Sequence, residues 1–205
     1  MPDSHMNQQL TLFETPKPLK ATPAKYSVFL AVFPDSSTAR HISELAMGIR
    51  EKYGLQGRVR PLSHLHVSLC FLGGCSDVSE KMIHFVGQIC EAIAVSTPAF
   101  EARFDEIISF RGGLGNRPLV LVNHSDGNTG LMRLHQALDT AFSKYRRHSS
   151  SNLKFNPHIT LLYDRQDIPK KPIDPTSWKV DEIVLVRSEV GATKYDRFGS
   201  WKLGS

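Results

Sequence analysis

The chain has 205 residues, of which 40% are hydrophobic, and a formal net charge of +5. This length fits one domain, or two small lobes that share one site, and the apolar content is enough for a packed core. The sequence has no run of about 18 apolar residues, which excludes a predicted membrane-spanning helix, and its basic character favours an anionic partner without naming one.

The N-terminal 24 residues contain four prolines and little apolar pattern, so they predict a flexible extension. Within this extension, Ser4-His5-Met6 matches the remnant of an expression tag, and His5 is therefore set aside from the site. We expect residues 25–205 to form a single domain with two lobes. The N-terminus lacks the apolar stretch of a secretory signal, and the three cysteines have no Cys-x-x-Cys spacing, which together predict a cytoplasmic protein.

Hydrophobic periodicity predicts three helices and seven strands along the rest of the chain. The helices are expected at residues 35–53, 79–95 and 126–147. The strands are expected at residues 26–33, 65–72, 100–110, 119–123, 157–163, 178–190 and 195–203, with a connector rich in proline and lysine at 168–175. A helix followed by a motif strand occurs twice, which indicates an internal duplication. We therefore predict an α+β protein with two pseudo-symmetric lobes, each a mainly antiparallel sheet with helices on one face.

Two of the predicted strands carry a histidine that is followed, two residues later, by a hydroxyl residue. These pairs are His66 with Ser68 and His158 with Thr160. Side chains alternate across a strand, so each histidine shares a face with its hydroxyl, whereas the intervening apolar residues point into a core. Two such strands predict a central groove with one motif on each wall.

The pattern His-x-Ser/Thr alone is common, and two further copies occur in this chain. His41-Ile42-Ser43 lies in a predicted helix, where residues two apart do not face each other, and His148-Ser149-Ser150 lies in a serine-rich loop. A single copy is typical of a partly buried histidine bonded to a nearby carbonyl. The pair in matching strand context favours a catalytic site.

Histidine exchanges a proton near neutral pH, so two histidines on opposite sides of one phosphorus atom can divide the work of acid and base. One deprotonates the attacking oxygen, and the other protonates the leaving oxygen. The two hydroxyls can donate hydrogen bonds to the non-bridging phosphoryl oxygens. This arrangement predicts phosphodiester chemistry without a metal or another cofactor.

Other chemistries find less support in the sequence. The Gly-x-Ser-x-Gly elbow of many serine hydrolases is absent. Cys70 shares the face of His66 only as an extension of the strand beyond Ser68, so cysteine catalysis finds no support. A metal site stays open as an alternative, because His64 and His66 would lie on one strand face and His158 could be a third ligand.

The motifs and their neighbours resemble the 2H phosphoesterase superfamily, and within it the bacterial RNA 2′,3′-cyclic phosphodiesterases once called 2′-5′ RNA ligases. The resemblance rests on both motifs, on Phe71-Leu72-Gly73 after the first and on Phe155-Asn156-Pro157 before the second. It covers residues 26–203. The family implies a two-lobed fold with pseudo-twofold symmetry and both motifs in a central groove.

The resemblance also implies an activity, namely the metal-independent opening of a 2′,3′-cyclic phosphate to a 2′-phosphate, with reversible 2′-5′ ligation in some members. By this resemblance His66 and His158 are the acid–base pair, and Ser68 and Thr160 bind the phosphate. The expected partner is RNA or a nucleotide, and we expect a monomer. A nucleotide-binding module with little turnover is the alternative of another class.

One position departs from the family pattern. Many bacterial members carry an arginine three residues after the second hydroxyl, where this chain has Tyr163, with Arg165 two residues further on. A smaller nucleotide or a 2′-5′ oligonucleotide is therefore an alternative to RNA. The glycine-rich residues 111–117 lack the ending of a phosphate-binding P-loop and predict a hairpin loop, from which Arg111 and Arg117 are further candidates for substrate binding.

Overall fold

The computed structural model describes residues 25–111, 116–124, 127–145, 155–192 and 194–204. Within these residues the chain forms three α-helices, two short 3₁₀ helices and eight β-strands, and the strands make two four-stranded sheets in which all pairs are antiparallel. The extension predicted at residues 1–24 lies outside the described part. No helix in the described part has the length and apolar character that a bilayer crossing requires.

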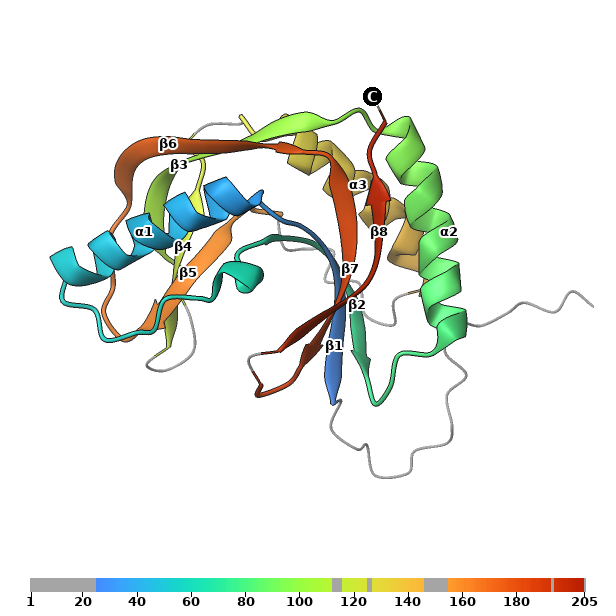
Figure 1. Cartoon of the computed structure of the whole chain (residues 1–205), viewed down its shortest axis with the longest axis horizontal. Coiled ribbons are helices and arrows are strands. Elements are labelled where there is room, and N and C mark those ends of the chain that lie inside the picture. Colours follow the sequence, from blue (N-terminus) through green and yellow to red (C-terminus); the bar gives the residue numbers. More distant parts are fainter. Residues whose placement is uncertain (1–24, 112–115, 125–126, 146–154, 193, 205) are drawn as a thin grey trace, which may run out of the picture.

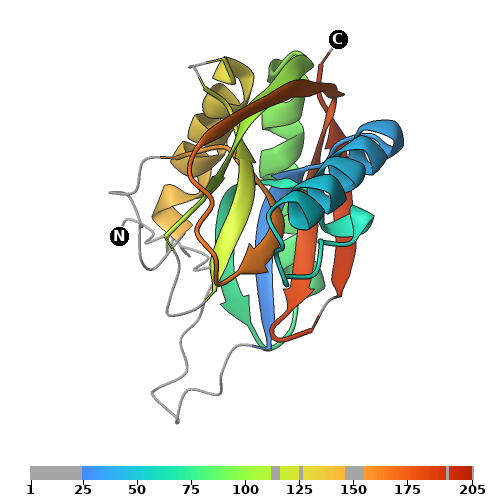
Figure 2. The same ribbon diagram turned by 90° about the vertical axis from the view of Figure 1, so that its left-hand side faces the viewer.

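The first sheet is built from both ends of the described chain. Its strands, in spatial order, are β2 (Val67–Cys75), β1 (Tyr26–Val32), β7 (Glu182–Glu189) and β8 (Tyr195–Lys202). Figure 2 shows these four strands side by side. Helix α2 (Glu80–Ser96) packs against β8, and helix α3 (Thr129–Phe142) packs against β2.

The second sheet is built from the middle of the chain. Its strands, in spatial order, are β5 (Ile159–Asp164), β4 (Arg117–Val122), β3 (Phe100–Ser109) and β6 (Lys171–Val180). Helix α1 (Ser36–Lys52) packs on β5 and β6, as Figure 1 shows, although it follows β1 of the first sheet in the chain. The prediction of an α+β protein with two antiparallel lobes is confirmed. The motif strands β2 and β5 both lie at an edge of their sheet.

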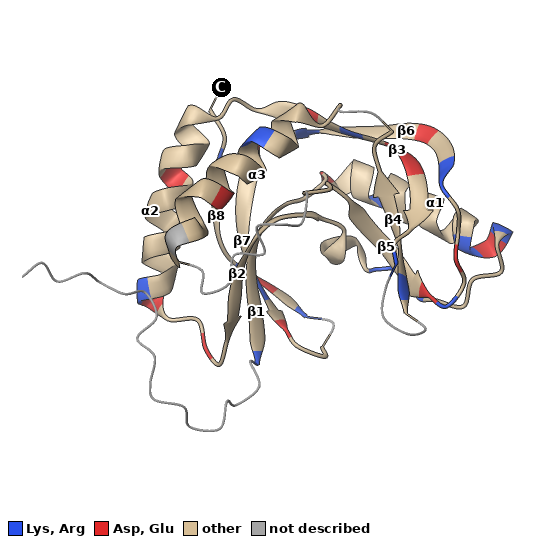
Figure 3. Cartoon of the chain, turned by 180° about the vertical axis from the view of Figure 1, so that it is seen from behind, with Lys and Arg blue, Asp and Glu red and all other residues tan. Residues whose placement is uncertain are grey.

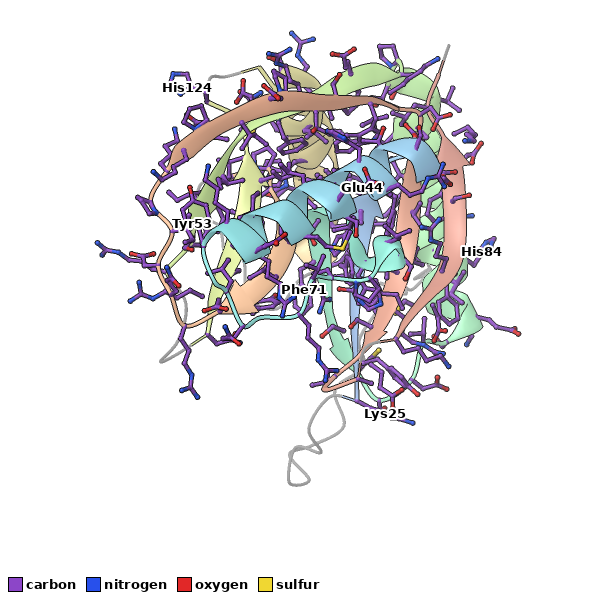
Figure 4. The ribbon with its side chains drawn as sticks, turned by 60° about the vertical axis from the view of Figure 1, so that its left-hand side comes forward. Lys25, Glu44, Tyr53, Phe71, His84 and His124 are labelled. Carbon is purple, nitrogen blue, oxygen red and sulfur yellow. The ribbon has the colours of Figure 1, made fainter. Side chains whose placement is uncertain are left out.

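Helix α1 shows how local sequence positions these layers. The carboxylate of Asp35 accepts hydrogen bonds of 2.9 Å from the backbone N–H groups of Ser37 and Thr38, which caps the helix. Ile42 is fully buried on the face toward the sheet, whereas Glu44 lies on the outer face (Figure 4).

Two predictions about the C-terminal third are wrong. The predicted connector at 168–175 overlaps β6, which begins at Lys171 and runs to Val180. The single strand predicted at 178–190 is in fact the end of β6 and all of β7, separated by Asp181, where the chain passes from the second sheet to the first (Figure 1). The third helix is shorter than predicted, since α3 begins at Thr129 and a 3₁₀ turn at Ser143–Tyr145 follows it. The predicted ends of that helix, Asp126 and Arg147, lie outside the described residues.

Candidate active site

The first motif lies at the start of β2. Nδ1 of His66 donates a hydrogen bond of 2.8 Å to the backbone carbonyl of His64, because a carbonyl oxygen can only accept. Nε2 is therefore the acceptor nitrogen of the neutral ring, and it lies 2.9 Å from the hydroxyl of Ser68. The prediction that these two side chains share a face is confirmed, and the intervening Val67 is fully buried.

The second motif repeats this geometry at the start of β5. Nδ1 of His158 donates a hydrogen bond of 2.8 Å to the backbone carbonyl of Asn156, again two residues earlier in the chain. Ile159 and Leu161 are fully buried, and Thr160 between them is partly exposed. In both histidines Nδ1–H is thus bound to a backbone carbonyl two residues earlier, and Nε2 is the nitrogen left for other partners.

The two motifs come together although 92 residues separate their histidines in the sequence. The backbone N–H of Arg60, which precedes the first motif, donates a hydrogen bond of 2.8 Å to the carbonyl of Leu161 in β5. His158 also lies close enough to His66 for its charge to lower the pKa of His66. The residues predicted to form one site therefore lie in one region.

An apolar and aromatic surface surrounds His66. The ring centres of Phe29, Phe33 and Tyr195 lie 5.2, 5.6 and 5.5 Å from the ring centre of His66. Strands β1 and β2 contain no charged residue, which Figure 3 shows as a tan stretch. Burial, aided by the charges of Arg60 and the neighbouring histidines, lowers the pKa of His66 to about 4. The imidazole is therefore neutral at neutral pH and can accept a proton.

The register of β2 differs from simple alternation. A shift between β1 and β2 pairs Ala31 with Ser68 and Phe29 with Phe71, so that Leu69 and Cys70 both turn into the core. The expectation that Cys70 extends the face of His66 is wrong, because this residue is 3% exposed within the core. Phe71, which is 55% exposed, lies on the site face instead (Figure 4).

Arg60 and Tyr195 are members of the site that the sequence did not single out. Nη2 of Arg60 donates to Nδ1 of His64 at 3.0 Å and to the hydroxyl of Tyr195 at 3.4 Å. The rings of His64 and Tyr195 stack at 3.9 Å with an angle of 6°. In the sequence, Arg60 precedes the first motif and Tyr195 begins the strand expected at 195–203. Neither position predicted that the two residues, which are 135 residues apart, would meet at the site.

The metal alternative required His64 and His66 to point to one position. His64 instead belongs to a 3₁₀ turn, where its Nδ1 accepts a hydrogen bond from Arg60. Among the described residues, no group of three or more His, Cys, Asp or Glu side chains is arranged to hold a metal ion.

Of the four candidate substrate-binding residues, Tyr163 is the one for which a contact with a member of the site is described. Tyr163 is 42% exposed, and its ring centre lies 5.9 Å from Cζ of Arg60, so it lies beside the site. Arg165 is exposed in the bend that follows the end of β5 at Asp164. Arg117 forms an ion pair of 3.0 Å with Asp167.

Arg111 is exposed at the end of the segment that follows β3, and residues 112–115 of the predicted hairpin loop lie outside the described part. The two unused copies of the motif also have their places. His41 lies in α1 as predicted, and His148 lies outside the described residues.

Comparisons with known proteins agree with this architecture. The sequence profile of the 2′-5′ RNA ligase superfamily matches residues 33–192. The crystal structure of TT0787 of Thermus thermophilus is similar with a TM-score of 0.69 and 22% identity, covering 87% of this chain and 99% of that one. E. coli LigT complexed with 3′-AMP is similar with a TM-score of 0.68 and 25% identity, covering 87% and 98%.

A more distant likeness concerns the fold alone. Usb1 of Kluyveromyces marxianus shares 11% identity with a TM-score of 0.50, covering 85% of this chain and 98% of that one. Comparison with curated protein sequences gives no match. The superfamily profile nevertheless spans β2, β5 and both histidine motifs. The chain therefore belongs to the 2′-5′ RNA ligase superfamily, the group of 2H phosphoesterases that its paired motifs resemble.

Proposed function

We propose that the protein is a monomeric cytoplasmic phosphodiesterase that opens 2′,3′-cyclic phosphate ends of RNA or nucleotides to 2′-phosphates without a metal ion. The observation that carries this proposal is the repeated geometry of His66 and His158. In each motif an Nδ1–H group is bound to the carbonyl two residues earlier, which leaves Nε2 for proton transfer. A binding module would not need two histidines whose Nδ1–H groups are both fixed on a backbone carbonyl.

The environment of the first motif supports a division of roles. His66 is neutral at neutral pH because its pKa is lowered to about 4, so it serves as the base. Its Nε2 takes a proton from water while the water oxygen forms a bond to phosphorus. The bond from phosphorus to the 3′ oxygen breaks, and His158 in its protonated form donates a proton to that oxygen. The product is a 2′-phosphate with a free 3′ hydroxyl.

The hydroxyls complete this proposal. In the structure the hydroxyl of Ser68 donates a hydrogen bond of 2.9 Å to Nε2 of His66. When a phosphate binds, the hydroxyl turns to a non-bridging oxygen, and Nε2 becomes accessible to water. The hydroxyl of Thr160, in the second motif, likewise donates a hydrogen bond to a non-bridging oxygen of the bound phosphate. Replacing either hydroxyl residue by alanine is expected to slow turnover by up to roughly 10²–10³-fold, less than removal of either histidine.

Solved relatives support a nucleotide substrate. E. coli LigT has been crystallised with 3′-AMP and with NADP⁺, each at 25% identity to this chain, and with ATP, at 23%. Tyr163 replaces the arginine common in bacterial members, so a 2′-5′ oligonucleotide remains the second candidate substrate. A nucleotide-binding module with little turnover is the outcome to expect if no substrate reacts.

The test is hydrolysis of a short RNA that ends in a 2′,3′-cyclic phosphate, with EDTA present. Wild type is compared with His66→Ala, His158→Ala and His41→Ala, the last being a control because His41 is exposed on α1. We expect a 2′-phosphate product from wild type and the control, and almost none from the other two variants. Wild-type turnover in either site variant would overturn the acid–base assignment. A lack of turnover in wild type would redirect the proposal to 2′-5′-linked substrates.

A further inference from the structure

An arginine lies beside His66 on the same face of the first sheet. The guanidinium carbon of Arg197, on β8, lies 4.1 Å from the ring centre of Phe33. That ring centre is in turn 5.6 Å from the ring centre of His66. The guanidinium group therefore lies within one nucleotide length of the base proposed for the reaction.

A cavity of about 350 Å³ adjoins this arginine. It is lined by Glu182, Val184, Arg197, Phe198, Gly199 and Ser200. Val184 belongs to the apolar cluster of Phe29, against which Phe33 packs, so the cavity opens on the face that carries His66. Its volume is at the lower end of the range for small-molecule sites, which suits one phosphate group and its sugar.

The charge of Arg197 has no acidic partner among the described residues. Glu182 also lines the cavity, but its carboxylate forms an ion pair of 3.4 Å with Lys202. A guanidinium that stacks on an aromatic ring is held in a fixed orientation, and its N–H groups stay directed outward at its edge. Such an edge matches two phosphate oxygens. The site of Arg197 therefore has the properties of an anion site that is already oriented.

We propose that Arg197, supported by Phe33, binds the phosphate on the 5′ oxygen of the nucleotide whose cyclic phosphate reacts at His66 and His158. This subsite rests on the proposed function, and it specifies the substrate as a nucleotide that carries a 5′ phosphate or is linked through one to a longer chain. A second cation of the site, in addition to Arg60, then comes from β8 of the first sheet. The position that holds an arginine in many bacterial members is Tyr163 in this chain.

The test begins with binding, which needs no turnover. Calorimetry compares adenosine 2′-monophosphate with adenosine 2′,5′-bisphosphate on wild type, Arg197→Gln and Arg40→Gln. Arg40 is exposed on α1 and serves as a control for the loss of one positive charge. We expect wild type and the control to bind the bisphosphate about 10-fold more tightly, as one charge-assisted pair allows, and the ratio to fall to about 1 in Arg197→Gln.

Two further variants separate charge from stacking. Arg197→Lys keeps the charge without the planar fork, and Phe33→Leu removes the ring beneath the guanidinium. Each is expected to give a ratio between those of wild type and Arg197→Gln. Equal binding of the two ligands by wild type, or an unchanged ratio in Arg197→Gln, would overturn the subsite.

Turnover rates then show whether Arg197 binds a terminal 5′ phosphate or an internucleotide phosphate. They also test the subsite separately from the proposed enzyme activity. Three cyclic phosphates are compared: adenosine 2′,3′-cyclic phosphate, the same compound with a 5′ phosphate, and a dinucleotide that ends in it. A gain from the 5′ phosphate alone assigns the subsite to a terminal phosphate, and a gain only in the dinucleotide assigns it to the internucleotide linkage. Hydrolysis of all three at equal rates leaves the proposed function intact and removes the subsite. Selective binding of the bisphosphate without hydrolysis of any of the three compounds would support the subsite and overturn the proposed phosphodiesterase activity.

Discussion

Nδ1 of His135, on α3, donates a hydrogen bond of 2.7 Å to the backbone carbonyl of Leu69, the residue that follows Ser68. The ring of His135 stacks at 3.9 Å on Phe155, which precedes the second motif. His135 thus connects the first motif strand to the chain that leads into the second. The bond from the N–H of Arg60 to the carbonyl of Leu161 is its counterpart, because it connects the lead-in of the first motif to β5. Each motif strand is therefore held by a hydrogen bond from a residue in the other half of the sequence.

The brace at His135 can be tested by separating its two contacts. His135→Phe keeps an aromatic ring for Phe155 but leaves the carbonyl of Leu69 without its donor, and His135→Ala removes both contacts. We expect each substitution to lower the free energy of unfolding by about 1–3 kcal/mol and to reduce kcat. His135→Ala should be the less stable of the two variants, because it loses both contacts. His84→Ala is the control, since His84 is exposed on α2 (Figure 4). Urea unfolding and single-turnover rates check this, and wild-type values for both variants would show that the brace is dispensable.

Arg60 is expected to set the pH at which the proposed base becomes active. Its positive charge lowers the pKa of His66, so Arg60→Gln raises that pKa. A base must be unprotonated to work, and the acidic limb of the kcat/KM profile should therefore move to higher pH. Arg58→Gln is the control, because Arg58 is exposed and is not among the charges that shift His66. An acidic limb at the same pH in wild type and Arg60→Gln would contradict this electrostatic role.

Acid should destabilise the protein through His66. The folded pKa of about 4 lies below the ordinary value of 6.5, so the unfolded chain binds the proton more readily between these values. Stability attributable to His66 is present above pH 6.5 and is lost as the pH falls toward 4, by at most about 3 kcal/mol. Unfolding free energies of wild type and His66→Asn at pH 7 and pH 4.5 check this. We expect wild type to lose more stability than the variant, and an equal loss would assign the acid sensitivity to other groups.

Gly57 is expected to be essential for the approach of the first lead-in to β5. A Cβ atom at this position would overlap the backbone carbonyl oxygen of Tyr163. The N–H of Gly57 also donates to the carboxylate of Asp164 at 2.7 Å, so the segment has little room to move. Gly57→Ala should therefore lower stability by about 1–3 kcal/mol and reduce activity. Gly48→Ala, in the exposed face of α1 with no atom near its Cβ, should raise stability by up to about 1 kcal/mol. Thermal unfolding of both variants distinguishes a local steric effect from a general response to alanine.

The sequence predicted those features that depend on local periodicity. Alternation over a few residues placed Ser68 with His66 and sent Val67 to the core, because the period of a strand is fixed by its backbone. The first part of strand β6 was missed because Pro172 and Pro175 are poor strand residues. They are tolerated in β6 because it is an edge strand, where an N–H can be spared.

Arg60 and Tyr195 were not predicted as members of the site for a different reason. Arg60 and Tyr195 meet only after the two ends of the chain have joined one sheet, and no pattern within a short window encodes that contact. The shift that sends Cys70 inward likewise depends on how β2 pairs with β1. Pairing partners, rather than residue types, were beyond the reach of a single sequence.

The central pair of the first sheet joins β1 at residues 26–32 to β7 at residues 182–189. During synthesis on the ribosome, β1 therefore emerges long before β7 exists, and α1 emerges before the sheet that it covers. Neither half of the nascent chain contains a complete lobe. Closing such long loops is slow, and the first sheet is expected to form only after β7 has been synthesised. Because the strands of the first sheet come from both ends of the described chain, the two histidine motifs are expected to come together only after β7 has joined that sheet.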